Sequence, residues 1–425
     1  MRIAFTTLGC KINQFETDVL RRDFESRGNT IVPFNAEADV YIINTCSVTA
    51  KSDYQCRQVI RSAVRRGRGA KVVVTGCYAE LQPDEIKNVA GVDLVFGNRE
   101  KNRIPEQLTA AFSTLLNRAI PGVDNRTVQP VHRRTRGFLK IQNGCNNRCS
   151  YCIVPFARGR SRSMPVQEVR QAFESLVEAR YPEIVLTGIH IGTYGSDLDT
   201  GINLTKLLKM LLPERGSARI RLSSIEPGEI TQELIGFLGK GLCRHLHIPL
   251  QSGDDAILAS MKRNYTSGFY RELLENIATQ VPGIALGSDV MVGFPGEGDQ
   301  EFQNTMRFVK ESPLTHLHVF SYSSRPGTKA ADMKAQVTEG IKKERSKTLR
   351  KLARDKNLLF REMHVGAKLA VVVEDKVDAR TGLLTGLTDN YIRVHISAAK
   401  QEHIGEKITV RISNVNEQEN FAEIL

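Results

Sequence analysis

Three cysteines crowd into one short loop in the first half of the chain. The loop, residues 144–152, has the pattern CxxxCxxC and directly follows the apolar segment 138–141; its cysteines are Cys145, Cys149 and Cys152. A cubane iron–sulfur cluster normally takes four thiolates. A loop that supplies only three therefore predicts a cluster in which one iron is open to a ligand that is not protein.

Structural zinc and disulfide bonding are the alternatives for this loop. Structural zinc prefers paired CxxC knuckles or Cys/His sets that fill a tetrahedron, and this spacing, without a neighbouring CxxC or HxxxH pair, does not fit. The chain opens with strand-like residues 1–5, shows no leader signature, and has no apolar run that approaches a membrane span. We therefore expect a cytoplasmic protein in a reducing compartment, where disulfides are rare.

The first hundred residues alternate short apolar segments with helical ones. Strands are predicted at 3–7, 40–44 and 72–75, with helices near 16–28 and 52–66. This alternation predicts an amino-terminal α/β domain with a parallel sheet over residues 1–100. Residues 101–137 are expected to form a linker, with a helix over 104–117 and a polar turn at 121–126.

A cysteine follows each of the three predicted strands almost at once: Cys10, Cys46 and Cys77. The carboxyl ends of parallel strands share one edge of a sheet, the edge where ligands bind. We therefore expect these cysteines to meet and form a second three-thiolate site. The alternative is three separately buried cysteines, which is how we interpret Cys56 and Cys243.

A second α/β alternation begins at residue 138. Strands are predicted at 138–143, 183–188, 219–224, 244–250, 285–294 and 316–323, and helices between them include 166–179, 204–212 and 302–311. Six βα units are too few for a closed eight-unit barrel, so residues 138–328 predict an open, three-quarter (βα)6 barrel of TIM type. The site is expected at the strand carboxyl ends. His245 and His247 are interpreted as core or cavity-lining residues.

The remainder of the chain predicts a helical connector and a small β-barrel. Residues 329–363 contain a long charged helix, and residues 364–425 contain β segments at 368–374, 383–387, 391–396 and 407–412. This pattern favours a small barrel of OB type. Residues 364–425 hold seven Lys/Arg against nine Asp/Glu, so we expect this barrel to position a substrate with little electrostatic attraction of its own.

The formal net charge of +12 favours a polyanionic partner. Charge runs are commonly solvated faces, but two of these flank the cysteine loop, which favours nucleic acid. The basic blocks are Arg57, Arg61, Arg65, Arg66, Arg68 and Lys71; Arg133, Arg134 and Arg136; Arg158, Arg160 and Arg162; and Lys342, Lys343, Arg345, Lys347, Arg350, Lys351 and Arg354.

Over nearly the whole chain these features resemble the radical S-adenosylmethionine methylthiotransferases. The CxxxCxxC loop, with the aromatic residue Tyr151 before its last cysteine, is similar to that superfamily's cluster loop. Cys10, Cys46 and Cys77 match the family's amino-terminal auxiliary-cluster cysteines. The carboxy-terminal barrel looks like a TRAM domain, a tRNA-binding module in this family.

The resemblance implies two 4Fe-4S clusters and S-adenosyl-L-methionine as cofactors. The loop cluster would bind S-adenosylmethionine and cleave it to a radical, while the auxiliary cluster would hold a sulfur that a first S-adenosylmethionine methylates. The radical would take a hydrogen from an adenine carbon, a bond beyond acid–base side chains, and the methylthio group would be delivered there. By analogy, the cofactor-binding candidates are Tyr151, Gly188, Ser224, Glu226, Gln251 and Asp289.

The family's branches modify threonylcarbamoyladenosine or isopentenyladenosine beside the tRNA anticodon, or an aspartate on a ribosomal protein. Residues 7–17, TLGCKINQFET, resemble the threonylcarbamoyl branch, whereas the other branches tend toward GCQMN or GCPKN. The implied partners are the tRNA anticodon stem-loop and a flavodoxin- or ferredoxin-type electron donor; neither DNA nor a membrane is expected.

Two other classes of function compete with this enzyme. One is a binding module in which a structural metal braces a basic RNA-binding surface without catalysis. The other is a thiol redox protein, which needs a resolving pair such as CxxC with a lowered pKa. Cys149 and Cys152 supply that spacing, but Cys145 and the absence of a thioredoxin-like sequence context argue against it.

Overall fold

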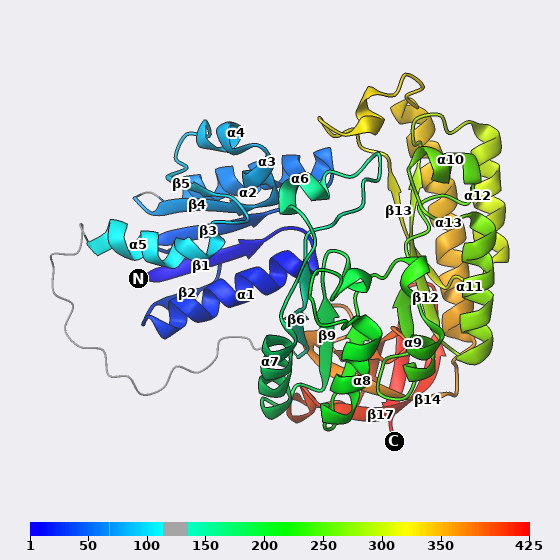
Figure 1. Ribbon diagram of the computed structural model, residues 1–425. Helices are drawn as coiled ribbons and strands as arrows, with labels where there is room; N and C mark the ends of the chain where they lie inside the picture. Colours follow the sequence, from blue (N-terminus) through cyan, green and yellow to red (C-terminus); the bar gives the residue numbers. More distant parts are fainter. Residues whose placement is uncertain (68, 114–134) are drawn as a thin grey trace. The chain divides into compact units, whose positions relative to one another are not determined.

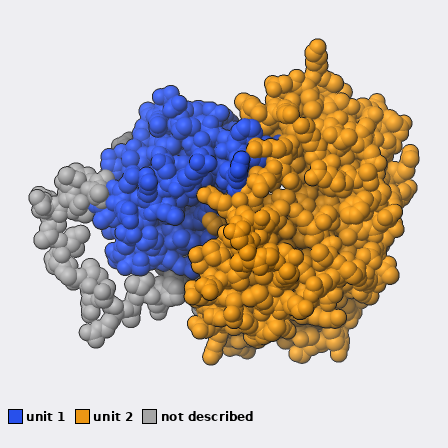
Figure 2. All heavy atoms as spheres, viewed as in Figure 1, with its two compact units in different colours: residues 1–133, 152–160 blue, residues 134–151, 161–425 orange. Residues whose placement is uncertain are grey.

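The computed structural model describes residues 1–67, 69–113 and 135–425. The chain forms two compact units (Figures 1 and 2): unit 1 comprises residues 1–133 and 152–160, and unit 2 comprises residues 134–151 and 161–425. Several predicted features lie outside the described residues: the end of the helix predicted over 104–117, the turn at 121–126, Arg68, Arg133 and Arg134. The predicted domain boundaries stay predictions.

Unit 1 contains a parallel five-stranded sheet in the order β2-β1-β3-β4-β5. Its strands are β1 Arg2–Thr7, β2 Thr30–Val32, β3 Val40–Thr45, β4 Lys71–Gly76 and β5 Leu94–Phe96. The predicted parallel α/β domain is confirmed. The two edge strands β2 and β5 escaped prediction because three residues are too few to show a period.

Helices cover both faces of this sheet, which explains why β3 is apolar throughout. Tyr41 and Ile43 belong to one buried cluster, whereas Val40 and Ile42 belong to another. A strand buried on both faces carries a continuous apolar run. The helices of unit 1 are α1 Lys11–Ser26, α2 Ala50–Arg66, α3 Cys77–Leu81, α4 Pro83–Lys87, α5 Ile104–Ser113 and α6 Val154–Arg158.

Unit 2 contains six parallel strands arranged as two three-stranded sheets, β6-β9-β10 and β11-β12-β13. The strands are β6 Gly137–Lys140, β9 Glu183–Thr187, β10 Arg219–Leu222, β11 His245–His247, β12 Ala285–Val292 and β13 His316–Ser321. A parallel bridge between Ile220 and Leu242 links the two sheets. Within the described residues β6 pairs with β9 and β13 with β12, and the first and last strands do not pair. The predicted open barrel is confirmed.

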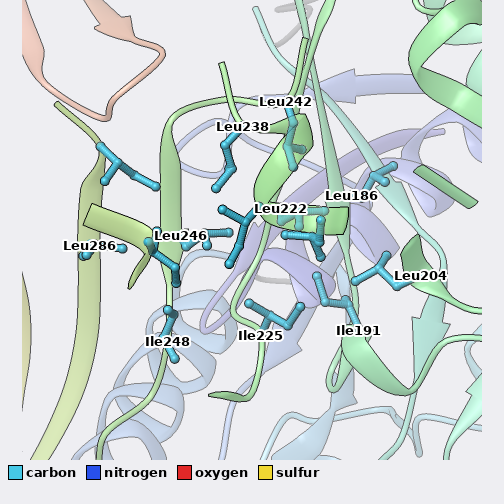
Figure 3. Packing of buried hydrophobic residues seen from close by; sticks show 14 of the residues in the cluster. Leu186, Ile191, Leu204, Leu222, Ile225, Leu238, Leu242, Leu246, Ile248 and Leu286 are labelled. Atoms are coloured by element: carbon cyan, nitrogen blue, oxygen red, sulfur yellow. The ribbon is translucent and has the colours of Figure 1, made fainter. Parts of the chain in front are cut away.

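The largest core of unit 2 lies between these strands and the surrounding helices. Leu186, Leu222, Leu246 and Leu286 come from four successive strands and point into one buried cluster (Figure 3). The helices are α7 Val166–Glu178, α8 Leu204–Glu214, α9 Gln232–Phe237, α10 Asp255–Ser260, α11 Ser267–Gln280 and α12 Asp299–Glu311. A small antiparallel pair, β7 Gln142–Asn143 and β8 Arg162–Ser163, flanks the cysteine loop in sequence.

The carboxy-terminal part of unit 2 consists of the long helix α13, Glu339–Glu362, and a closed β-barrel. The strand order is β14-β15-β16-β18-β17. The strands are β14 Lys368–Val377, β15 Leu384–Thr388, β16 Arg393–Ser397, β17 Lys407–Val415 and β18 Asn420–Ile424. The predicted small barrel is confirmed, but β18, which closes it, was not predicted. Short 3-10 helices lie at Lys101–Arg103, Ile191–Thr193, Pro227–Glu229, Lys329–Asp332 and Gln401–His403.

A buried charge cluster joins the partial barrel to the carboxy-terminal barrel within unit 2. Glu183, fully buried at the start of β9, accepts hydrogen bonds from Arg219 and Arg221 at 2.8–2.9 Å. Arg219 also donates to the carbonyls of Ala370 and Leu387, at 2.9 and 2.7 Å. One carboxylate therefore holds two arginines that in turn fix the second barrel.

Candidate active site

The three strand-end cysteines of unit 1 lie at one edge of its sheet, because β1, β3 and β4 are adjacent and parallel. Cys10 precedes α1, Cys46 follows β3, and Cys77 begins α3. Burial, together with the nearby Cys77 and Cys10 sulfurs, raises the pKa of the Cys46 thiol to about 11. The structure therefore brings together the three cysteines that the strand-end pattern singled out.

Two glycines permit the cysteine loops to approach this closely. Gly9 has a φ of +102°, and a Cβ at this position would lie 2.7 Å from the Cβ of Cys46. Gly76 has a φ of +104°, and its Cβ would lie 2.4 Å from the carbonyl oxygen of Thr45. An L side chain is excluded at both positions by conformation and by space. The Gly-Cys dipeptides are thus a backbone requirement of the site.

The side chain of Asn13, in the first turn of α1, ties two of these loops together. Its Nδ2 donates to the carbonyl oxygens of Leu8, at 2.8 Å, and Thr45, at 2.9 Å. The Nδ2 of Asn44 in turn donates to the backbone oxygen of Asn13 at 2.9 Å. Asn13 is fully buried, so these bonds fix the backbone immediately before Cys10 and Cys46.

The loop that carries Cys77 is held by Asn98, which lies later in unit 1. Asn98 Nδ2 lies 3.6 Å from the sulfur of Cys77 and donates to the backbone oxygen of Ala157 at 2.7 Å. Ala157 lies in α6, which packs against α3. The segment that follows the CxxxCxxC loop therefore forms part of the surroundings of Cys77.

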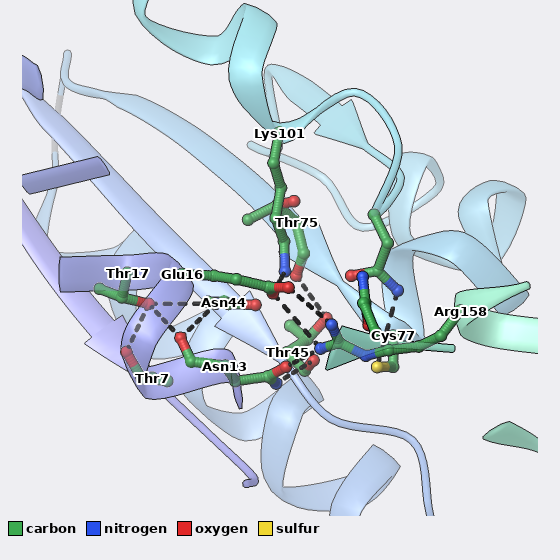
Figure 4. Close-up of polar contacts among 12 residues, drawn as sticks. Thr7, Asn13, Glu16, Thr17, Asn44, Thr45, Thr75, Cys77, Lys101 and Arg158 are labelled. Carbon is green, nitrogen blue, oxygen red and sulfur yellow. Dashed lines mark hydrogen bonds and ion pairs between the residues drawn. The ribbon is translucent and has the colours of Figure 1, made fainter. Parts of the chain in front are cut away.

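A buried ionic cluster lies beside the same cysteines (Figure 4). Glu16 in α1 accepts from Arg158 at 2.6 Å and forms an ion pair with Lys101, and Arg158 also donates to Asn13. Burial alone lowers the pKa of Arg158, but Cys77, Glu16 and Cys10 together raise it above its usual value. Burial lowers the pKa of Lys101. Two basic groups thus share one carboxylate next to three cysteines.

The first two cysteines of the CxxxCxxC loop lie in unit 2, and Cys152 begins the segment assigned to unit 1. The sulfur of Cys145 accepts from the backbone N–H of Asn147 at 3.4 Å and lies 3.5 Å from Nδ1 of His190. His190 also pairs with Glu229. Burial lowers the pKa of His190, but Cys145 and Glu229 outweigh it and raise the pKa to about 10. A protonated imidazole therefore lies within hydrogen-bonding distance of the Cys145 sulfur.

Cys149 has a cationic neighbour of its own. The guanidinium of Arg263 donates to its sulfur at 3.3 Å and forms an ion pair with Glu226. Arg263 is almost entirely buried, and its guanidinium carbon lies 5.0 Å from the centroid of the Tyr265 ring. Burial raises the pKa of Glu226 despite this arginine. Glu226, predicted to bind the cofactor, thus lies next to a cysteine of the loop.

The remaining predicted cofactor contacts divide into two groups. Gln251 has a positive φ of 66°, its backbone N–H donates to the carbonyl of Asp289 at 2.8 Å, and its buried Oε1 has no hydrogen-bond partner among the described residues. A buried orphan acceptor fits a ligand hydroxyl or amine. Gly188 instead packs closely against the side chain of Ile191, because a Cβ at position 188 would lie 2.5 Å from Cγ2 of Ile191. Ser224 is exposed and Tyr151 half-buried.

The carboxylate of Asp289 points toward two histidines of the partial barrel, the buried His247 and the exposed His318. Asp289 Oδ1 lies 3.1 Å from His247 Nε2 and 3.3 Å from His318 Nδ1. Burial raises the pKa of Asp289, but the two histidines outweigh it and lower the pKa overall. His245 and His247 are buried, as expected. Sequence reasoning had not connected these histidines with Asp289.

The basic blocks are less uniformly exposed than the sequence suggested. Arg158 is buried beside Glu16, and in α13 both Lys342 and Arg345 are buried, the latter paired with Glu297 at 2.8 Å. The expectation that these three belong to a solvated basic surface is wrong, because each points into its own unit. The exposed members include Arg61, Arg65, Arg66, Arg160, Arg162, Lys343, Lys347, Arg350, Lys351 and Arg354.

Residues in the surroundings of the cysteines were missed because no local pattern marks them. Arg158 was visible only as one member of a basic run, and Arg263 lies in an unremarkable turn after α10. Neither residue stands out from its neighbours in the sequence, because Arg158 belongs to a basic run and Arg263 directly follows Lys262. Among the described helices, none is both long and apolar enough to cross a membrane.

Comparison with known proteins identifies the family. Residues 2–97 match the uncharacterized protein family UPF0004, residues 139–309 the radical SAM superfamily, and residues 362–425 the TRAM domain. The threonylcarbamoyladenosine tRNA methylthiotransferase MtaB of Bacillus subtilis is 41% identical, over 96% of this chain and 93% of that protein. The chain belongs to the radical S-adenosylmethionine methylthiotransferase family. It is a radical SAM enzyme, and this membership implies S-adenosylmethionine and a 4Fe-4S cluster.

A second relative and a solved structure are also similar to this chain. The tRNA-2-methylthio-N(6)-dimethylallyladenosine synthase of Fusobacterium nucleatum is 31% identical over the full length of both chains. The solved structure of the radical S-adenosylmethionine methyltransferase TsrM from Kitasatospora setae has a TM-score of 0.58 at 17% identity, covering 78% of this chain and 77% of that one. This likeness shows the fold alone.

The residues present fit the clusters of a methylthiotransferase. In unit 2 the sulfurs of Cys145 and Cys149 each have an N–H donor, from Asn147 and Arg263 respectively, and such donors support thiolate ligands. In unit 1 three cysteines gather beside an excess of basic groups. Both donor sets therefore match what an anionic iron–sulfur cluster requires.

Proposed function

We propose that this chain methylthiolates C2 of threonylcarbamoyladenosine beside the anticodon of tRNA. The observation that carries the proposal is the gathering of Cys10, Cys46 and Cys77 at one sheet edge, in a chain that also has the CxxxCxxC loop. A single cluster would suffice to cleave S-adenosylmethionine. A second three-cysteine site is what sulfur insertion needs in addition.

The choice of substrate rests on the comparison between relatives. The relative named for threonylcarbamoyladenosine is 41% identical, and the one named for dimethylallyladenosine is 31% identical, each over nearly the whole chain. The two names differ in the group on the adenine, and both place the reaction on tRNA. The larger identity favours threonylcarbamoyladenosine, and the dimethylallyl substrate remains the second candidate.

Cys145, Cys149 and Cys152 would hold one 4Fe-4S cluster, and Cys10, Cys46 and Cys77 the other. When bound, the clusters and two molecules of S-adenosylmethionine would supply the radical, the methyl group and the sulfur that no side chain can provide. Arg263 orients Cys149 by hydrogen bonding, and protonated His190 does so for Cys145. Gln251 Oε1 is available to accept from a hydroxyl or amine of the cofactor.

The tRNA would be held by exposed basic residues and the TRAM domain. Lys343, Lys347, Lys351 and Arg354 are exposed on α13, which leads directly into the carboxy-terminal barrel. Phosphate contacts by lysine and arginine release counterions, so affinity falls steeply as salt concentration rises. The electron donor is expected to be a small flavodoxin- or ferredoxin-type protein.

The substrate is tested by mass spectrometry of tRNA nucleosides from cells that lack the gene. We expect 2-methylthio-threonylcarbamoyladenosine to disappear and threonylcarbamoyladenosine to accumulate, with the dimethylallyl product unchanged. Loss of the methylthio-dimethylallyl nucleoside instead would transfer the assignment to the second candidate. No change in either nucleoside, in a strain without another such enzyme, would overturn the proposal.

The two-cluster arrangement is tested by anaerobic reconstitution. Two cubanes give about eight irons per chain, and Cys77→Ala is expected to retain about four, to lose methylthiolation, and to keep some uncoupled S-adenosylmethionine cleavage. Cys243→Ala is the control, because Cys243 is a buried cysteine of unit 2 that belongs to neither three-cysteine set. About four irons in the wild type, without cleavage under reductant, would favour a metal-braced RNA-binding module.

A further inference from the structure

Arg158 differs from the other arginines of its basic run. The side chain of Arg158 is 1% exposed, whereas Arg160 and Arg162 are exposed. Arg158 is the last residue of α6 and lies six positions after Cys152, in the segment that belongs to unit 1. A buried arginine is costly unless its charge is compensated, so its placement requires a reason.

The contacts of Arg158 reach two of the three cysteine-bearing loops of unit 1. Its guanidinium donates to Asn13, whose own amide donates to the carbonyl oxygens of Leu8 and Thr45, just before Cys10 and Cys46. Hydrogen bonds of this kind fix backbone geometry because neither donor nor acceptor is exposed to water.

The third loop is connected through the residue that precedes Arg158. The carbonyl oxygen of Ala157 accepts from Asn98 at 2.7 Å, and the same Asn98 amide lies 3.6 Å from the sulfur of Cys77. Figure 4 shows Arg158 extending toward Cys77. The end of α6 is therefore in contact, directly or through one side chain, with all three loops.

Two basic side chains meet one carboxylate beside these cysteines. Glu16 accepts from Arg158 through both of its oxygens, at 2.6 and 3.3 Å, and also pairs with Lys101. An arginine side chain stays charged in proteins. Three thiolates on a cubane cluster, together with an anionic sulfur ligand on its open iron, would place negative charge beside these two basic groups.

We propose that Arg158 is a positioning residue of the auxiliary site, and that its charge strengthens binding of an anionic sulfur ligand to the open iron there. This inference rests on the proposed function, because it requires a cluster at Cys10, Cys46 and Cys77. Arg158 acts through the cysteines and Asn13. Arg158 lies six residues after Cys152, so a side chain from the segment that carries Cys152 contributes to the auxiliary site.

The test uses the full chain with Cys145, Cys149 and Cys152 replaced by alanine, so that spectra report only the auxiliary cluster. Methanethiolate is titrated and followed by electron paramagnetic resonance of the reduced cluster. We expect Arg158→Met to weaken methanethiolate binding about tenfold or more, and to shift the reduction equilibrium about tenfold toward the oxidised cluster, roughly 59 mV lower for one electron. Arg158→Lys and the exposed control Arg160→Met should stay near the parent.

A merely structural role is separated by the cluster-free protein. Without the cluster, Arg158→Met removes one of the two basic groups that share Glu16 and leaves the Lys101–Glu16 pair intact, so thermal stability should change little. With the cluster, the same substitution should lower stability. Loss of stability in both states would show that Arg158 only supports packing, and would overturn the inference.

The remaining outcomes distinguish this inference from the proposed function. If the parent protein with the loop cysteines replaced binds no cluster, the proposed function fails. If it binds one, and Arg158→Met leaves ligand affinity and potential unchanged, the inference alone fails. If Arg158→Met prevents cluster assembly, Arg158→Lys decides: retained iron supports a role for the charge, and lost iron overturns it.

Discussion

Replacing Glu183 with glutamine tests whether one buried carboxylate holds the two barrels of unit 2 together. Glu183 is fully buried, and it pairs with Arg221, which is also fully buried, and Arg219, which is 6% exposed. Glutamine keeps the shape and one acceptor but removes the charge. Leaving buried guanidinium groups without their anion costs about 3–5 kcal/mol, which for a unit of this size lowers the thermal midpoint by roughly 5–8 °C.

The assay is thermal unfolding of the cluster-free chain, combined with hydrogen exchange of residues 384–390. Arg219 and Arg221 donate to the carbonyls of Leu387, Thr388 and Asp389, so amides of this segment should exchange faster in Glu183→Gln. The matched control is Glu174→Gln, because Glu174 is 53% exposed and lies 3.9 Å from Arg170. An exposed pair contributes about 1 kcal/mol or less.

The pH dependence gives an independent check. Burial raises the pKa of Glu183, but Arg221 and Arg219 outweigh it and lower the pKa below the usual carboxyl range. The carboxylate therefore stabilises the folded state at neutral pH, and this contribution is lost as pH falls below about 4.5. The gap between wild type and Glu183→Gln should stay constant from pH 8 to about 5 and narrow below that. A shift no larger than that of Glu174→Gln at pH 7 would refute the reasoning.

Three further predictions follow from the site. Gly9→Ala should reduce iron from about eight to about four per chain, because its Cβ would lie 2.7 Å from the Cβ of Cys46. The control is Gly28→Ala, which should retain all the iron because nothing lies within 4 Å of the added Cβ. Equal iron in both variants would contradict this prediction. Burial lowers the pKa of His316 to about 3, so the stability that its neutral form contributes above pH 6.5 is lost at up to about 1.4 kcal/mol per pH unit as pH falls toward 3. The thermal midpoint of His316→Asn should therefore fall less steeply with decreasing pH than that of the wild type. Equal slopes in the two proteins would count against this prediction. Arg263→Met should slow uncoupled S-adenosylmethionine cleavage about tenfold or more, since hydrogen bonds to charged groups contribute about 1.5–3 kcal/mol. The half-buried Arg271, which pairs with Glu311, is the control, and Arg271→Met should not slow cleavage. Unchanged cleavage in Arg263→Met would exclude a role for this arginine.

Much of the architecture could be predicted because its signals are local and repeated. Alternating apolar and helical segments identified the principal strands of unit 1 and the six strands of the partial barrel. The strands β2, β5 and β18 escaped because they are short or polar, and they form only where neighbouring strands offer backbone partners. The strand predicted over 244–250 shrank to His245–His247, ahead of Pro249, because proline cannot donate to a ladder.

The sequence by itself determined where the candidate cysteines lie. The CxxxCxxC spacing puts three of them in one loop, and the placement of Cys10, Cys46 and Cys77 after three parallel strands brings them to one sheet edge. Only the tertiary structure decided which charges surround them. Arg158 and Arg160 are arginines of the same basic run, yet Arg158 is buried against Glu16 and Arg160 is exposed. The physical reason is that burial of a charge depends on partners brought from distant parts of the chain, and those contacts leave no periodic trace in the sequence.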